Sequence, residues 1–98
     1  MDQEYHRNYQ IAYRNEKRRK LLAYLLEHPC VDCGEPDPIV LEFDHLPGFE
    51  KVKNVSALVI GTWAWARVEA EIAKCEVVCS NCHKRRTAKR SGDWFKST

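Results

Sequence analysis

The stretch Cys79-Ser80-Asn81-Cys82-His83-Lys84-Arg85-Arg86 decides how this chain folds, because it combines two thiols, an imidazole and three cations. A second cysteine pair with the same spacing, Cys30 and Cys33, lies well upstream. Tetrahedral zinc takes four thiolates, and each Cys-x-x-Cys turn supplies two of them. The spacing therefore predicts a structural zinc site on Cys30, Cys33, Cys79 and Cys82.

Other interpretations of the cysteines are weaker. The same four ligands suit a mononuclear iron site, and two reduced thiol pairs in the core need no metal at all. Residues 79–83 also match the Cys-x-x-Cys-His pattern of covalent haem attachment. The chain offers only Met1 as a methionine ligand, and no export signal is evident, so haem is disfavoured. Cys75, the fifth cysteine, is expected to be a small buried apolar residue.

Length and composition restrict the class of protein. The 98 residues predict a single domain spanning residues 1–98. No apolar run approaches the ~20 residues of a membrane span, and residues 1–5 lack the apolar core of a secretory signal. An odd cysteine count argues against a pure disulfide framework. We expect a reducing, intracellular (cytoplasmic) compartment and no membrane association.

Charge is distributed unevenly along the chain, although the formal net charge is only +2. Residues 30–82 carry four Lys or Arg against nine Asp or Glu, whereas residues 83–98 carry six against one. A basic segment directly after the second cysteine pair fits a polyanionic partner. The plainer interpretation is a solvated charged face.

The N-terminal extension, residues 1–28, is predicted to be helical. Residues 5–27 contain no Gly or Pro and many good helix formers. Apolar residues of the two halves fall on different faces, so the helix either breaks within residues 14–20 or packs against different elements. The basic side chains of that segment are expected to be exposed; they are Arg14, Lys17, Arg18, Arg19 and Lys20.

The remaining pattern predicts an α+β fold with two short strands and helices between them. Residues 39–43 have strand composition and end before Asp44-His45, and residues 76–78 form the second strand. We expect a short helix at residues 55–60, a helix capped by Thr62, and a last helix from Ser80 to about Arg90. Residues 91–98 are predicted to be a tail.

A candidate catalytic cluster follows from this arrangement. Helical spacing puts His83 on one face of the last helix, and zinc ties the start of that helix to the cysteine turn before the first strand. The end of that strand, Asp44-His45, can thus meet His83. Asp44 and His83 are suitable ligands for a hydrated divalent cation, and His45 is suited to act as general base on water. Because strand residues alternate, this interpretation requires the strand to end or twist at Asp44.

Four cations of the last helix complete the candidate site. Arg86 and Arg90 share the helix face of His83, and Lys84 and Arg85 lie beside them in sequence. Guanidinium and ammonium groups hold phosphates of nucleic acids. We therefore expect this helix to contact a phosphate backbone.

The combined pattern resembles the HNH endonucleases: Cys-x2-Cys, a strand ending in Asp-His, then Cys-x2-Cys-His followed by basic residues. The resemblance covers residues 30–90. It implies a ββα-metal (His-Me finger) core with a four-cysteine zinc site, a long N-terminal helix and an inserted helix between the strands. It also implies hydrolysis of DNA phosphodiester bonds, with Mg²⁺, Mn²⁺ or a similar ion on Asp44 and His83, and with His45 as general base.

One position departs from that family. Lys74 occupies the position at which that family has its middle Asn. Asn54 or Asn81 is therefore the candidate to hold His45 in place instead. The alternative function is a zinc-stabilised nucleic-acid-binding module without cleavage; a zinc-ribbon-like protein-interaction module would not need the basic last helix. Because the chain is small, we expect it to need a homodimer or a protein partner to recognise a specific DNA sequence.

Overall fold

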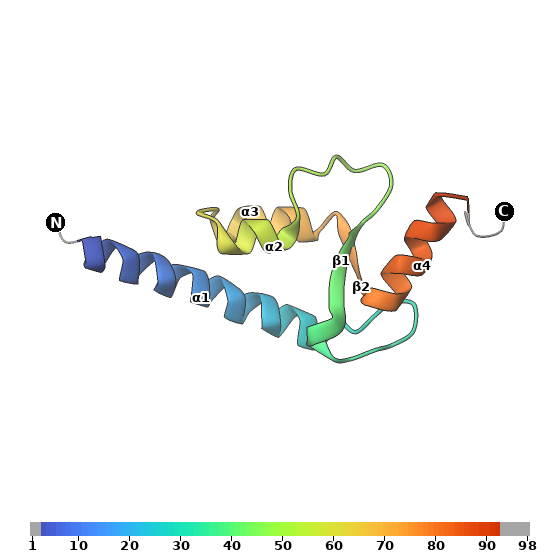
Figure 1. Ribbon diagram of the computed structural model, residues 1–98, viewed down its shortest axis with the longest axis horizontal. Coiled ribbons are helices and arrows are strands. Elements are labelled where there is room, and N and C mark those ends of the chain that lie inside the picture. Colours follow the sequence, from blue (N-terminus) through green and yellow to red (C-terminus); the bar gives the residue numbers. More distant parts are fainter. Residues whose placement is uncertain (1–2, 93–98) are drawn as a thin grey trace.

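The computed structural model describes residues 3–92 of the chain. These residues contain two short strands and four α-helices. The fold is a small mixed α+β arrangement, as predicted. Its elements in chain order are α1 (Gln3–Glu27), a 3-10 turn (Pro38–Val40), β1 (Leu41–His45), α2 (Val55–Ile60), α3 (Trp65–Ile72), β2 (Cys75–Cys79) and α4 (Ser80–Arg90). The molecule is elongated, with extents of 61 × 25 × 23 Å, because α1 projects beyond the rest (Figure 1).

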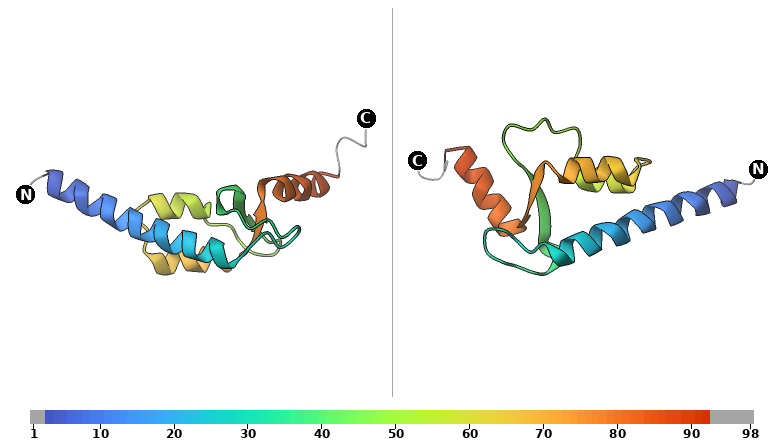
Figure 2. Two further views of the ribbon diagram at one scale, coloured as in Figure 1. Left: turned by 90° about the horizontal axis from the view of Figure 1, so that it is seen from below. Right: turned by 180° about the vertical axis from the view of Figure 1, so that it is seen from behind.

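The two strands pair antiparallel, with Leu41 opposite Cys79 and His45 opposite Cys75. This register places the start of α4 beside the start of β1. In Figures 1 and 2 the strands lie between α4 on one side and α2 with α3 on the other. The strand pair therefore presents two faces, each covered by different helices.

The buried apolar residues also form two clusters, one around the strands and one between helices. One buried cluster surrounds the strands and the cysteines; it comprises Leu25, Cys30, Leu41, Val77, Val78, Cys79 and Cys82. The other lies within α2 and α3; it comprises Val55, Leu58, Val59, Val68 and Ile72. Leu21 and Tyr24 of α1 contact both clusters. The C-terminal half of α1 therefore packs on the core through Leu21 and Leu25, whereas Leu22 and Leu26 are exposed.

The prediction that Lys17 is exposed is wrong. Only 2 % of Lys17 is accessible, and its Nζ donates to the carbonyls of Leu58 at 3.2 Å, Gly61 at 2.8 Å and Trp63 at 2.8 Å. The last carbonyls of a helix have no partner within it. Lys17 caps the end of α2 and fastens α1 to it, so α1 runs through residues 14–20 without a break.

Several predicted boundaries shift. The first strand begins later and continues through His45, because Pro38–Val40 form a 3-10 turn whose first amide is bound by the Asp37 side chain, 2.9 Å from the Ile39 nitrogen. The two helices predicted for the insertion are present, whereas the resemblance implied one. The second of them, α3, begins at Trp65 after an Ala64 N-cap, so the predicted Thr62 cap is wrong. Of the predicted tail, residues 93–98 lie outside the described residues.

Among residues 3–92, no helix is both long and apolar enough to cross a membrane.

Candidate metal centre and catalytic cluster

The four predicted cysteines come together. Their sulfur atoms all lie within 4.8 Å of one another, and the Sγ atoms of Cys33 and Cys79 are 3.7 Å apart. A zinc tetrahedron with Zn–S bonds of ~2.3 Å has S–S edges of about 3.8 Å. All four thiols are free of disulfides. The cluster therefore fits a metal ion such as zinc.

Local backbone geometry forms this site. Gly34 adopts φ +82°, a conformation that glycine accepts at no steric cost, and its N–H donates to the Cys30 carbonyl at 2.8 Å. The Val31 N–H donates to the Val77 carbonyl at 3.0 Å, which fixes the turn to β2. Cys79, rather than the predicted Ser80, is the N-cap of α4. The helix N-terminus thus faces a thiol, and its partial positive charge favours the thiolate.

The four thiols influence one another: the pKa values of Cys33 and Cys82 are raised, whereas that of Cys30 is lowered. Burial by itself raises the pKa of Cys30, but hydrogen bonds from the backbone of Cys79, Cys33 and Asp32 lower it to about 6. Zinc binds the thiolate, so a ligand that loses its proton readily binds with a smaller cost.

Asp44 lies on the α4 face of the strands. It is 2 % exposed. The two Arg90 Nη atoms lie 2.7 Å from Oδ1 and 2.8 Å from Oδ2 of Asp44, and Arg86 Nη1 lies 2.8 Å from Oδ2. His83 Nε2 is 3.5 Å from Oδ1. Hydrogen bonding to Arg90, opposed by burial and assisted by Arg86, lowers the pKa of Asp44 to about 2. The structure therefore brings Asp44 and His83 together.

The guanidinium group of Arg86 is bound to carboxylates of other segments and so is less available to a phosphate than was predicted. Its Nε and Nη2 each lie 2.7 Å from a carboxylate oxygen of Asp32 in the cysteine turn. Its Nη1 also reaches Glu76 of β2 at 3.0 Å, besides Asp44. These carboxylates, Asp32 first, raise the pKa of Arg86. Arg86 therefore joins the cysteine turn, both strands and α4.

Glu42 positions His83 and was missed by the sequence analysis. The Nδ1 atom of His83 is 2.7 Å from Glu42 Oε1, which leaves Nε2 facing Asp44. Glu42 also accepts a hydrogen bond from Ser80 Oγ at 3.0 Å. Strand alternation is the sequence feature that could have revealed Glu42, since Glu42 and Asp44 are two residues apart and share one face of the strand.

His45 lies elsewhere. Its Nε2 is 2.7 Å from Oε2 of Glu71 in α3, on the other side of the strands from α4. Since β1 continues through His45, the strand does not end at Asp44, and the two side chains alternate. The structure brings His45 together with Glu71, not with the Asp44–His83 pair.

Glu71 is the second residue that the sequence analysis missed. It is 3 % exposed, and it also accepts hydrogen bonds from Lys74 Nζ at 3.0 Å and the Val52 N–H at 3.1 Å. Burial opposes ionisation, but Lys74, His45 and the Val52 amide lower the pKa of Glu71 overall. The signal was its spacing: Glu71 follows Val68 by three residues on the buried face of α3. Glu71, not Asn54 or Asn81, holds His45.

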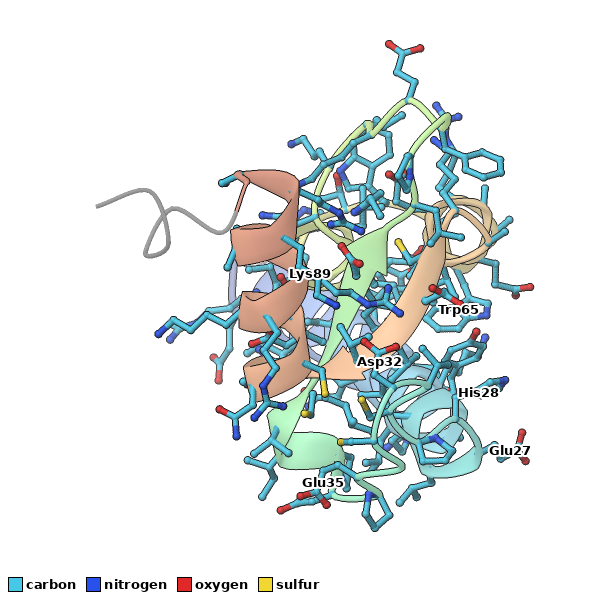
Figure 3. The ribbon with its side chains drawn as sticks, turned by 90° about the vertical axis from the view of Figure 1, so that its right-hand side faces the viewer. Glu27, His28, Asp32, Glu35, Trp65 and Lys89 are labelled. Carbon is cyan, nitrogen blue, oxygen red and sulfur yellow. The ribbon has the colours of Figure 1, made fainter. Side chains whose placement is uncertain are left out.

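The remaining cations of α4 are largely exposed. Lys84 is exposed and lines a groove of about 340 Å³ with Glu42 and His83. Arg85, also exposed, lines a second groove of about 430 Å³ with Asp32 and Lys89. Figure 3 shows Lys89 on α4 above the cysteine turn that carries Asp32. Lys89, which was not among the predicted contacts, extends the cationic surface.

A divalent cation on Asp44 and His83 is sterically reasonable. Two adjacent ligands of an octahedral Mg²⁺ with bonds of 2.0–2.1 Å lie about 3 Å apart, and the observed Oδ1–Nε2 distance is 3.5 Å. Such an ion would have to displace Arg90 from Oδ1. Within residues 3–92, only the cysteine cluster gathers three or more His, Cys, Asp or Glu ligand atoms at one point.

Comparison with known proteins gives no further guide. No family model, curated protein or solved structure matches the chain. Function is therefore inferred from the residues and their geometry.

Proposed function

We propose that this chain is a metal-dependent endonuclease of the HNH type that hydrolyses phosphodiester bonds in DNA. One observation carries the proposal: Asp44 and His83 approach to 3.5 Å at the point where a strand passes the first turns of a basic helix. That helix begins at the cysteine cluster, and a structural zinc there would fix its position. An acid, an imidazole and a cationic helix at one place suit phosphoryl chemistry.

Asp44 and His83 are the proposed ligands of a catalytic Mg²⁺, Mn²⁺ or similar ion. When bound, the ion supplies stabilisation of negative charge on the phosphate and on the leaving oxygen. Glu42 accepts the Nδ1–H of His83, which keeps the lone pair of Nε2 available to the ion. Arg90, released from Asp44, then contacts a neighbouring phosphate together with Lys84 and Arg85.

His45 is the proposed general base. Hydrogen bonding of its Nε2–H to Glu71 fixes the tautomer and leaves Nδ1 to take a proton from water. Asp44 and His45 are consecutive residues of a strand that pairs on one edge only. We place the scissile phosphate at the outer edge of β1, where it meets the ligands of α4 on one side and His45 on the other.

A second candidate function is DNA binding without cleavage on the same scaffold. It is favoured by the saturation of Asp44, whose two oxygens already accept hydrogen bonds from Arg90 and Arg86 at 2.7–2.8 Å. In that case Asp44 serves to hold the two arginines against the strands, and no catalytic ion is needed.

Plasmid nicking combined with DNA binding separates the two functions. We expect zinc-loaded protein to nick supercoiled plasmid only with added Mg²⁺ or Mn²⁺. His45→Ala is expected to abolish nicking and to leave binding in a gel-shift assay nearly unchanged. The matched control is His28→Ala, since His28 is exposed and stacks on Tyr24. Binding without nicking at any cation would favour the second function, and absence of both would contradict both.

A further inference from the structure

A groove of about 410 Å³ lies between the N-terminal half of α1 and the end of α2. The N-terminal half of α1, which contributes most of its lining, projects away from α4 along the long axis of the molecule (Figure 1). Its lining includes His6, Tyr9, Tyr13 and Arg14 from α1 and Gly61 from the turn after α2. None of these residues takes part in the nuclease proposed above.

Two tyrosines form an ordered aromatic surface in this groove. Their rings are stacked, with centroids 6.5 Å apart and an interplanar angle of 7°. Tyr13 is held in place by its hydroxyl, which donates to the Trp63 carbonyl at 3.3 Å, and by Lys17 Nζ, 4.8 Å from the ring centroid. Tyr9 is 63 % exposed. An exposed ring on a fixed neighbour provides a platform for stacking a planar group.

Arg14, which is partly buried, also lines this groove. Its Nε is buried, yet it has no hydrogen-bond partner among residues 3–92. A buried donor without an acceptor is unfavourable, and an acceptor from outside the chain would remove that cost. Because guanidinium pairs well with phosphate, the acceptor that fits Arg14 is an anionic oxygen.

Three further cations lie beside tryptophan rings outside the groove. Lys53 Nζ and Arg67 lie 5.7 Å and 5.5 Å from the Trp63 ring centroid, and Lys20 Nζ lies 5.7 Å from that of Trp65. Surfaces that combine positive charge with aromatic faces bind single-stranded nucleic acids, because bases stack on the rings while the cations follow the phosphates. An acidic peptide would use the cations but has no planar bases for the rings.

We infer that this groove binds a nucleotide of a single-stranded nucleic acid. The base stacks on Tyr9, and the phosphate accepts hydrogen bonds from Arg14. Lys53 and Arg67, which lie beside Trp63 in the turn after α2, supply further positive charge. The site is separate from α4 and does not require cleavage, so it would hold a single-stranded segment at one end of the molecule while α4 contacts DNA at the other.

Fluorescence anisotropy with a labelled short oligothymidylate tests the inference on the full, zinc-loaded chain without added Mg²⁺. Tyr9→Ala and Arg14→Ala are each expected to weaken binding roughly tenfold, in the range found for loss of one stacked base. Tyr9→Phe keeps the ring and is expected to retain binding. The matched control is Arg18→Ala, which removes the same charge from an exposed position of α1 outside the groove.

Three results would overturn the inference. One is equal affinity of Tyr9→Ala, Arg14→Ala and Arg18→Ala, with unchanged circular dichroism and zinc content. Another is retained binding by Tyr9→Ala with loss in Tyr9→Phe. The third is competition by polyglutamate as effective as that by unlabelled oligothymidylate, which would assign the groove to an acidic peptide. The assay contains no Mg²⁺ and does not measure cleavage, so failure of the nuclease proposal would leave this result unaffected.

Discussion

Two buried carboxylates, Asp44 and Glu71, lie on opposite sides of the same strand pair and differ in their partners. Asp44 is held by Arg90 and Arg86 of α4. Glu71 is held by His45, Lys74 and a backbone amide. The partners of Asp44 belong to a largely exposed basic helix, so a cation or a phosphate can replace them. Of all these partners Arg90 is the most exposed, with 43 % of its side chain accessible, against 13 % for His45 and 24 % for Lys74. Glu71 is therefore better suited to be a fixed anchor. Ligand exchange is thus expected at Asp44 and positioning at Glu71.

The two sides also depend on different parts of the core. The position of α4 depends on Cys79 and Cys82, which belong to the buried cluster around the strands. Glu71 lies on α3, whose buried residues pack with α2. Loss of the metal centre should therefore disturb Asp44 first and Glu71 much less.

Cys30→Ser is expected to have the largest effect, because it removes one of the four thiols that could hold a zinc ion, and a structural zinc would contribute directly to the free energy of folding. The variant should lose its zinc, about one ion per chain in the wild type, and unfold or melt far below the wild type. Atomic absorption and thermal circular dichroism measure the two changes. Cys75→Ser is the control, since Cys75 lies outside the cluster. A zinc-free Cys30→Ser protein with the wild-type melting temperature would refute the metal centre.

Glu71→Ala comes next. It leaves His45, Lys74 and the Val52 amide without their shared acceptor, and loss of one member of a buried charged network typically costs ~3–5 kcal/mol. Urea unfolding should show a loss in this range, while Glu71→Gln, which keeps the volume and an acceptor oxygen, should lose about 1–2 kcal/mol. A loss below about 1 kcal/mol for Glu71→Ala would show that Glu71 is no anchor.

Asp44→Asn should destabilise less than Glu71→Ala, by about 2 kcal/mol. Arg86 keeps Asp32 and Glu76 as partners, and Arg90 is exposed, so neither guanidinium is left buried and unpaired. The same urea titration measures this. If Asp44→Asn proved the more destabilising of the two, Asp44 would be the structural anchor, and the assignment of roles to the two carboxylates would be reversed.

The smallest expected effect is the pH dependence of the stability that Asp44 contributes. Its pKa of about 2 in the folded chain lies below the ~3.9 of an unfolded aspartate. Its contribution to stability is therefore complete above about pH 4 and is lost as the pH falls toward 2. Unfolding free energies measured across this interval should fall more steeply for the wild type than for Asp44→Asn. Parallel curves would mean that the arginines do not hold the ionised carboxylate.

Local patterns in the sequence predicted much of the fold. Cys-x-x-Cys spacing predicted the four-sulfur cluster, and helical spacing predicted the face of α4 that carries His83, Arg86 and Arg90. These features depend on residues close together in sequence, or on one chemically unambiguous ligand set.

Contacts between distant segments could not be predicted in the same way. Lys17 satisfies carbonyls more than forty positions away, and an interior position for a lysine contradicts its usual preference. Glu71 approaches His45 only because α3 folds back on β1. The direction of His45 depended on whether β1 ended at Asp44, and the pairing with Cys75 decided that.

The central claim, that Asp44 exchanges Arg90 for a divalent cation, is tested most directly by Mn²⁺ binding to zinc-loaded protein, followed by electron paramagnetic resonance. The wild type is expected to bind Mn²⁺ weakly, Asp44→Asn and His83→Ala to lose that binding, and Arg90→Ala to bind more tightly because a competing cation is gone. Glu71→Gln should bind as the wild type does. Absence of Mn²⁺ binding to the wild type and to Arg90→Ala, or equal binding by all variants, would contradict the claim.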